Sequence, residues 1–229
     1  MDAEFPRFSQ RMLEMIAPNY LAPTPSMAIA EIQPDSSRGD LSKGFIVPRG
    51  TMMDSLALKK TGVTCSYTTA HEVNLLPLKI ERIELGGVPA DLPLAQLGLS
   101  QRGISSALRI RIACDGPQHL GHLDFDRLEF FLSGPDIEAL KLLELVMEHH
   151  AGIVCQTVSK QPQRQLLSSD ALRQEGFNAD QALLPDDLRN FDGYRLLQEY
   201  FAFPARFRFI SLSGLGKLIQ RCEDEKAFD

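Results

Sequence analysis

The residues that could bind a metal lie close together in one stretch of the sequence. His119 and His122 are three positions apart, and Asp124 and Asp126 follow at alternate positions. Imidazole nitrogens and carboxylate oxygens bind divalent metals, and a bound metal can activate water for hydrolysis. One hypothesis is therefore a metal-dependent hydrolase that uses these four side chains.

We favour a structural interpretation of the same residues. The segment around the two histidines is turn-like, and no cysteine or carboxylate motif of matching spacing completes a zinc site. Two aspartates on one face of a strand are typical of a solvated surface. The sequence also contains no GxSxG motif, P-loop or Rossmann fingerprint. We therefore expect no catalytic residues, no metal and no cofactor.

A second group of residues is notable for its density of aromatic side chains. Seven of the seventeen aromatic residues lie in NFDGYRLLQEYFAFPARFRFI, at positions 190–210. Helical periodicity places the apolar residues in two neighbouring stripes, with Tyr194, Leu197 and Phe201 in one and Leu196, Tyr200 and Phe203 in the other. So wide an apolar arc is either enclosed within the domain or in contact with another chain. The pattern alone leaves both alternatives open.

Two charged residues of the same segment are spaced for an ion pair. Arg195 and Glu199 stand at positions i and i+4, between the apolar stripes. The candidate interface or motif core consists of eight residues: Phe191, Tyr194, Arg195, Leu197, Glu199, Tyr200, Phe201 and Phe203.

Periodicity also predicts the elements that position these residues. Apolar residues at helical spacing predict four helices, in segments 5–17, 134–150, 168–177 and 192–201. Alternation and turn residues predict about eight strands, in segments 26–33, 44–51, 63–69, 75–85, 106–114, 122–132, 153–158 and 207–212. The apolar positions change parity near Glu81, which predicts a bend or bulge there.

The order of these elements indicates the fold class. Strands joined by hairpins and long connections favour an α+β fold, with an antiparallel β-sandwich-like core and about four flanking helices. We predict four consecutive parts: an N-terminal helix and linker (1–25), a β-rich domain (26–134), an α+β segment packed on or beside it (135–219) and a frayed polar tail (220–229).

Composition excludes several classes of protein. The net charge of −6 comes from 24 basic and 30 acidic residues, without a run of lysine or arginine, so nucleic acid is not an expected partner. The apolar runs are too short to insert into a membrane, and the N-terminus lacks a secretory signal, so we expect a cytoplasmic protein. The four cysteines are widely separated, as expected of small buried side chains.

Several longer segments resemble the TssF family of type VI secretion baseplate subunits. They are FPRFSQRMLEMIAPNYLAPTPSMAIAEI, GFIVPRGTMMDS, YTTAHEVNLLPLKI, LEFFLSGP and above all GFNADQALLPDDLRNFDGYRLLQEYFAFPARFRFISLSGL. Together they cover the chain from about Pro6 to Leu215, and the candidate interface residues lie in the most characteristic of them.

The resemblance implies a structural part of a contractile injection machine, without enzymatic activity. It implies an internal fragment of a longer chain, and a wedge similar to those of contractile phage tails. The implied partners are TssG, other TssF copies, TssK, the VgrG hub, TssE and the sheath components. The implied location is the cytoplasmic face of the inner membrane.

One further alternative rests on the aromatic residues themselves. A β-sandwich module that binds carbohydrate or peptide would use them as a flat platform beside a groove. This alternative predicts coplanar, exposed rings, whereas the hydrolase predicts a bound metal.

Overall fold

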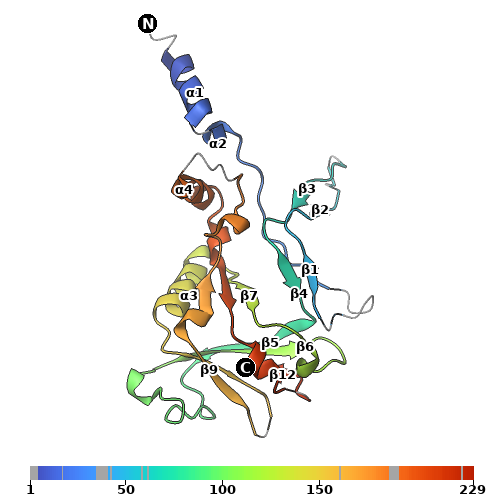
Figure 1. Ribbon diagram of the computed structural model, residues 1–229, viewed down its shortest axis with the longest axis vertical. Helices are drawn as coiled ribbons and strands as arrows, with labels where there is room; N and C mark the ends of the chain where they lie inside the picture. The colour runs from blue at the N-terminus through green and yellow to red at the C-terminus, as the bar shows by residue number, and fades with distance from the viewer. Residues whose placement is uncertain are drawn as a thin grey trace. The chain divides into compact units, whose positions relative to one another are not determined.

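The computed structural model describes residues 5–16, 18–34, 41, 43–57, 59–60, 62–159, 161–185, 191–222 and 224–229. The chain forms two compact units, each built from segments that are far apart in the sequence (Figure 1). Unit 1 consists of Met1–Glu31, Pro48–Glu72 and Glu175–Phe209, and unit 2 of Ile32–Val47, Val73–Gln174 and Ile210–Asp229. The predicted division into four consecutive parts stays a prediction, because compactness alone does not define domains.

The described part of unit 1 contains three α-helices, two short 3-10 helices and a small hairpin. Its elements are α1 (Phe5–Ile16), α2 (Pro18–Leu21), β2 (Met52–Asp54), β3 (Ser66–Thr68) and α4 (Asp192–Ala202). Strands β2 and β3 pair antiparallel, with Met53 opposite Tyr67. The predicted helices at 5–17 and 192–201 are confirmed as α1 and α4, because the apolar spacing of both segments fits the helical repeat.

The interior of unit 1 contains many polar side chains. Its buried apolar residues include Ala182, Leu184 and Phe207. Its buried polar and charged residues are Thr69, Glu175, Gln181, Arg195, Glu199, Arg206 and Arg208. Such groups are stable inside a protein only when hydrogen bonds replace the water that they lose.

Unit 2 contains most of the strands. Its strands are β1 (Phe45–Val47), β4 (Val73–Leu75), β5 (Leu78–Gly86), β6 (Ala107–Cys114), β7 (Leu128–Phe131), β8 (Ile153–Gln156), β9 (Arg164–Leu167), β10 (Leu172–Gln174), β11 (Phe209–Leu212) and β12 (Ala227–Phe228). Its helices are α3 (Asp136–Glu148) and α5 (Gly216–Ile219). The sheets have the orders β1-β4, β10-β11-β7, β12-β6-β5 and β8-β9.

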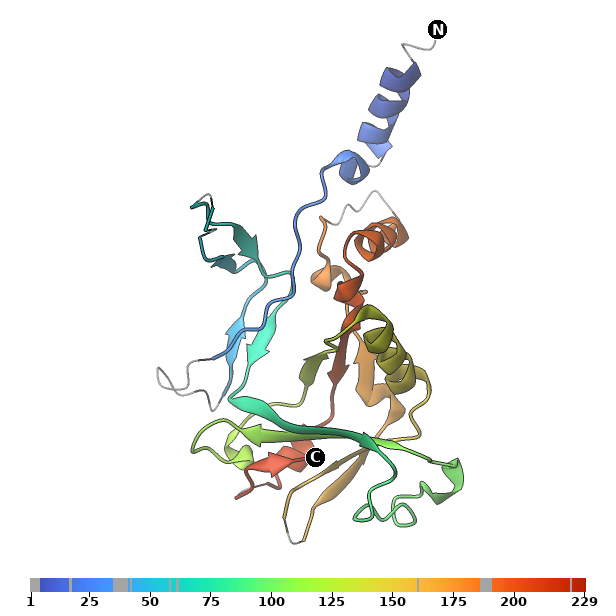
Figure 2. The same cartoon turned by 180° about the vertical axis from the view of Figure 1, so that it is seen from behind.

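The longest strands of unit 2 are β5 and β6, which lie side by side in Figure 2. They pair antiparallel, and the register shifts between Ile80 and Arg82. This shift confirms the bulge predicted near Glu81. The short strand β12 pairs with the other side of β6.

Strand β12 also contacts β8. The backbone N–H of Gln156 donates to the carbonyl of Asp229 at 2.8 Å, and the N–H of Asp229 donates to the carbonyl of Gln156 at 2.8 Å. These bonds join the β12-β6-β5 sheet to the β8-β9 hairpin. Segments distant in the sequence therefore meet at the end of β12.

The hydrophobic core of unit 2 includes the C-terminal segment. Cys222 is fully buried and Phe228 is 2% exposed. Both pack in one apolar cluster with Ile112, Leu120 and Phe125. The structure thus differs from the frayed tail predicted for 220–229, because two apolar residues among polar neighbours anchor the segment.

The α+β class and the antiparallel pairing of strands are confirmed. Among the described residues the strands are divided over several small sheets. No helix in the described part of the chain has the length and apolar content needed to cross a membrane.

Two predicted elements are wrong, and a third is shorter than predicted. Residues 26–33 form no strand, because their backbone joins none of the sheets of the described residues. The predicted helix at 168–177 is a 3-10 turn followed by β10, in which Leu172 pairs with Leu212. In segment 122–132 only Leu128–Phe131 forms a strand.

Candidate protein–protein interface

Helix α4 turns Arg195 and Glu199 inward and its aromatic residues outward. Glu199 is fully buried and Arg195 is 8% exposed. Five large apolar residues of the same segment are between 50% and 80% exposed: Phe191, Tyr194, Leu197, Tyr200 and Phe201. This is the reverse of the usual amphipathic helix, in which apolar residues face the core.

Glu199 fixes this orientation through hydrogen bonds. Its Oε1 accepts the backbone N–H groups of Leu183 at 3.0 Å and Leu184 at 3.1 Å. The same oxygen accepts Nη1 of Arg195 at 3.1 Å, which is the ion pair predicted from the i, i+4 spacing. A buried carboxylate needs such donors, so rotating α4 would leave its charge without compensation.

Other long side chains hold the loop against which α4 packs. Arg49 donates to the carbonyl oxygens of Ala179, Asp180 and Ala182 at 3.2, 3.0 and 2.8 Å. Nη2 of Arg206 donates to the carbonyl of Gln181 at 2.9 Å. These side-chain bonds add to the backbone hydrogen bonds of the 3-10 turn at Ala179–Gln181, and together they support the helix.

We define the aromatic face as Phe191, Tyr194, Leu197, Tyr200 and Phe201. Of the remaining candidate residues, Phe203 is half-buried, whereas Arg195 and Glu199 belong to the supporting interior. The apolar stripe of Tyr194, Leu197 and Phe201 therefore points outward, which sequence periodicity alone left open. Exposed apolar patches of this kind mark protein interaction sites.

The rings of the aromatic face do not form a flat platform. The ring planes of Phe191 and Tyr194 lie at 89° to each other, and those of Tyr200 and Phe201 at 81°. A sugar ring stacks on a flat aromatic surface, so this geometry argues against a carbohydrate platform.

The residues of the metal hypothesis have other contacts. The Asp126 carboxylate accepts the backbone N–H of Gly214 at 3.1 Å and that of Gly216 at 2.8 Å. Nδ1 of His119 lies 2.9 Å from the carbonyl oxygen of Asp224. Among the described residues, no group of three or more histidine, cysteine or acidic side chains is arranged to hold a metal.

The buried cysteines have the properties of core residues. Burial raises the pKa of Cys155 to about 12. The pKa of Cys222 is raised to about 11, mainly by burial and to a smaller extent by the negative charge of Glu225. Burial also raises the pKa of Cys114. Thiols with such high pKa values stay protonated and unreactive at neutral pH.

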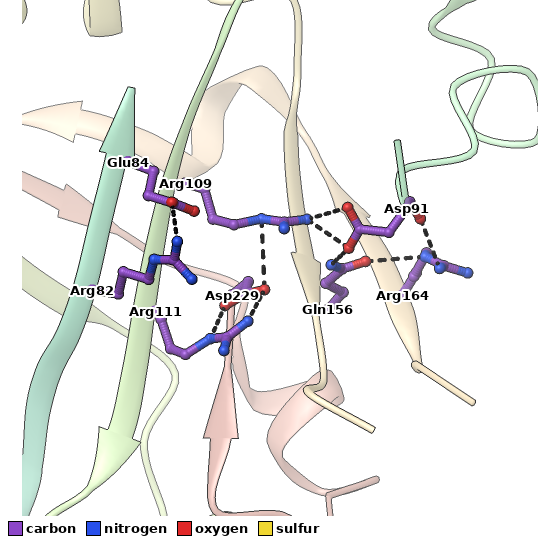
Figure 3. A network of polar contacts seen from close by, with 8 residues as sticks. All are labelled: Arg82, Glu84, Asp91, Arg109, Arg111, Gln156, Arg164 and Asp229. Atoms are coloured by element: carbon purple, nitrogen blue, oxygen red, sulfur yellow. Dashed lines mark hydrogen bonds and ion pairs between the residues drawn. The ribbon is translucent and has the colours of Figure 1, made fainter. Parts of the chain in front are cut away.

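Sequence reasoning missed a polar groove in unit 2. It is lined by Asp91, Arg111, Gln156, Arg164 and Asp229, and Figure 3 shows the network of polar contacts that joins these residues to Arg109. Arg109 and Arg111 stand at alternate positions of β6. Their partners come from segments far away in the chain, so no local pattern could identify the groove.

Ion pairs organise one side of this groove. Nη2 of Arg109 donates to both carboxylate oxygens of Asp91, at 2.8 and 2.7 Å. Arg111 donates to the Asp229 carboxylate through Nε at 2.7 Å and Nη2 at 3.1 Å. The hydrogen bond from Arg109 lowers the pKa of Asp91, and the bond to Asp229 raises the pKa of Arg111.

Comparisons with known proteins agree on one family. The family model described as "Type VI secretion system, TssF" matches residues 1–229. The chain is 38% identical to the type VI secretion system component TssF1 of Pseudomonas aeruginosa strain PAO1, over 99% of this chain and 36% of that protein. The chain therefore spans about a third of the length of this curated relative.

A solved structure supports the fold. The chain is similar to a chain in the TssK-TssF-TssG baseplate subcomplex of the type VI secretion system, determined by cryo-electron microscopy. The TM-score is 0.72 at 21% identity, and the match covers 99% of this chain and 39% of that chain. Because the family model covers the whole sequence and the relative is clearly homologous, this chain belongs to the TssF family of type VI secretion system proteins.

Proposed function

We propose that this chain is part of a structural subunit of the type VI secretion baseplate, and that its aromatic face binds a neighbouring baseplate protein. The observation that carries the proposal is the inverted helix α4. It buries Arg195 and Glu199 and exposes five large apolar side chains. A protein gains nothing in stability from exposing these residues, whereas an interface does use them.

The proposed role is structural and not enzymatic. TssF is a family of structural baseplate proteins. Buried Glu199 and Arg206 of unit 1 hydrogen-bond the loop backbone, which stiffens the support beneath the helix. The chain thus acts by holding its neighbours in a fixed geometry.

The partners follow from the family. The similar solved chain is in a subcomplex with TssK and TssG, which makes these two proteins the first candidates for contact with this chain. We extend the proposal to other TssF copies, the VgrG hub, TssE and the sheath. The proposed location is the cytoplasmic face of the inner membrane, where a baseplate would initiate the tube and sheath.

The experiment is co-purification of the full-length protein with TssG and TssK from the same secretion system. Phe201→Glu places a charge on the aromatic face, and we expect it to reduce recovery of the complex at least tenfold, because a charge cannot be desolvated there without a partner. Phe201→Leu keeps the site apolar and should give recovery close to wild type.

Thermal unfolding of the same variants separates binding from folding. Since Phe201 is 80% exposed, Phe201→Glu should change the free energy of unfolding by no more than about 0.5 kcal/mol. If Phe201→Glu and the equivalent variant Tyr194→Glu both form the complex normally, the proposal that the aromatic face belongs to the interface is wrong.

A further inference from the structure

The lining of the groove of unit 2 contains two guanidinium groups and two carboxylate groups, and a third guanidinium group, that of Arg109, pairs with one of these carboxylates. The groove has a volume of about 750 Å³, and its lining includes Asp91, Arg111, Gln156, Val158, Arg164 and Asp229. Arg109 joins the same network through Asp91. The network thus contains three arginines and two aspartates, although the whole chain has a net charge of −6.

Two of the arginines already bind carboxylates. Arg109 pairs with Asp91 at 2.7 Å, and Arg111 donates hydrogen bonds from Nε and Nη2 to the two carboxylate oxygens of Asp229. The Asp229 side chain is only 7% exposed, so its pairing is part of the folded structure. These pairs show that the groove holds guanidinium groups in positions where carboxylates can meet them.

Arg164 is held in place without a carboxylate. Its Nε donates to Oε1 of Gln156 at 3.1 Å, and its Nη2 donates to the backbone carbonyl of Asp91 at 3.1 Å. In the described part of the chain, no carboxylate forms an ion pair with Arg164. A guanidinium has five N–H donors, so three of those on Arg164 remain for another acceptor.

We propose that this groove binds an acidic side chain of a neighbouring protein, and that Arg164 is the residue that pairs with it. Two neutral acceptors fix the guanidinium before binding, which lowers the entropy that the new pair costs. The half-exposed Val158 adds an apolar contact at the same site. The bound segment therefore carries an aspartate or glutamate next to an apolar residue.

The charge balance favours a carboxylate over a polyanion. The network of three arginines and two aspartates has an excess of one positive charge, and the aspartates repel a doubly charged or multiply charged group. Nucleic acid binding depends on many cationic contacts to phosphates, which this groove does not supply. A single carboxylate matches the excess.

The inference rests on the proposed function only in the choice of neighbours, which are other baseplate proteins. The test uses overlapping twelve-residue peptides that cover TssG and TssK, bound to the full-length protein and measured by fluorescence anisotropy. We expect binding peptides to contain an aspartate or glutamate, and replacing it by asparagine or glutamine should raise Kd about tenfold.

Variants of the groove test the assigned residue. Arg164→Gln removes the charge and should raise Kd about tenfold, since charge-assisted hydrogen bonds are lost. Arg164→Lys keeps the charge without the planar fork and should give an intermediate Kd. The matched control is Arg173→Gln, which removes the same charge from an exposed position on β10 outside the groove and should leave Kd unchanged.

Three results would overturn the proposal: no peptide binds, Arg164→Gln binds as tightly as wild type, or acidic and amide peptides bind equally. Displacement of the peptide by inorganic phosphate at concentrations where acetate has no effect would also overturn the choice of a carboxylate. If the wild-type protein still co-purifies with TssG and TssK, any of these results rejects the groove alone. Loss of co-purification as well would reject the proposed function.

Discussion

Glu199 determines, at the scale of single residues, which side of α4 faces outward. It is fully buried, and three donors converge on its Oε1. Glu199→Ala should lower the free energy of unfolding by about 3–5 kcal/mol, because it leaves the Arg195 charge buried without its partner. Urea denaturation measures this loss.

The double variant Arg195→Met with Glu199→Leu is the control for this prediction. Removing both charges should recover much of the lost stability, since no buried charge remains uncompensated. Equal destabilisation by Glu199→Ala and by Glu144→Ala, a substitution at an exposed position on α3, would contradict the structural role of Glu199.

The thiol of Cys155 makes the stability of the folded protein fall as the pH rises into the alkaline range. Burial raises its pKa from 9.0 to about 12, so the folded state keeps its proton over a range where the unfolded chain loses it. The contribution of the Cys155 thiol to the free energy of unfolding is complete below pH 9 and disappears as the pH rises from about 9 to about 12. At about pH 10.5 it should have fallen by roughly 2 kcal/mol.

Urea denaturation between about pH 8 and pH 10.5 tests this on the wild type and on Cys155→Ala. The variant should be less stable at pH 8, because it leaves a small cavity, but it should lose less stability on going to the higher pH. Parallel pH profiles of the two proteins would contradict the assignment.

Single-residue sequence reasoning succeeded where partners are local and failed where they are distant. The Arg195–Glu199 pair follows from spacing along one helix, and the structure forms it. The donors from Leu183 and Leu184 decide that the pair is buried, and no periodicity connects these residues to Glu199. The inward side of α4 was therefore unpredictable from its own sequence.

At the scale of elements, Asp126 holds the turn that leads into α5. Its carboxylate accepts the N–H groups of Gly214 and Gly216. Gly214 has φ of +86°, a conformation that favours glycine. The two hydrogen bonds to Asp126 stabilise the turn in this conformation. Asp126→Ala should lower the free energy of unfolding by about 1–2 kcal/mol.

Asp124 is the matched control, because it is exposed and lies two residues away. Asp124→Ala should change the free energy of unfolding by less than about 0.5 kcal/mol. Equal effects of the two substitutions, or a stability gain from added zinc that either substitution abolishes, would contradict the structural account of this segment and favour a metal site.

Strong periodicity predicted whole elements, and tertiary pairing explains the errors. The helices α1, α3 and α4 and the strands β5 and β6 follow from their patterns, as does the bulge between Ile80 and Arg82. Segment 168–177 has helical features, but pairing of Leu172 with Leu212 places part of it in a strand. Such pairing between distant segments overrides local preference.

At the scale of the whole molecule, two phenylalanines distinguish the core from the proposed interface. Phe228 is 2% exposed and belongs to the core of unit 2, whereas Phe201 is 80% exposed. Phe228→Ala should cost about 3–5 kcal/mol of unfolding free energy, and Phe201→Ala less than about 0.5 kcal/mol. Thermal or urea unfolding compares them, and comparable losses would contradict this assignment of core and surface.

Composition and the family resemblance predicted the class of the protein correctly. They could not predict the two compact units, because each unit joins segments separated by many residues. The groove of unit 2 could not be predicted for the same reason. The arginines and aspartates of its polar network come from β6, β9, the connection after β5 and the end of β12. Only the folded chain brings these groups together.

The central claim is that the aromatic face of α4 becomes buried against a neighbouring baseplate protein. Hydroxyl-radical footprinting with mass spectrometry measures the reactivity of individual aromatic side chains, with the full-length protein alone and in complex with TssG and TssK. We predict that Tyr194 and Phe201 become at least several-fold less reactive in the complex, while the already buried Phe228 changes little. Unchanged reactivity of Tyr194 and Phe201 in a stable complex would contradict the claim.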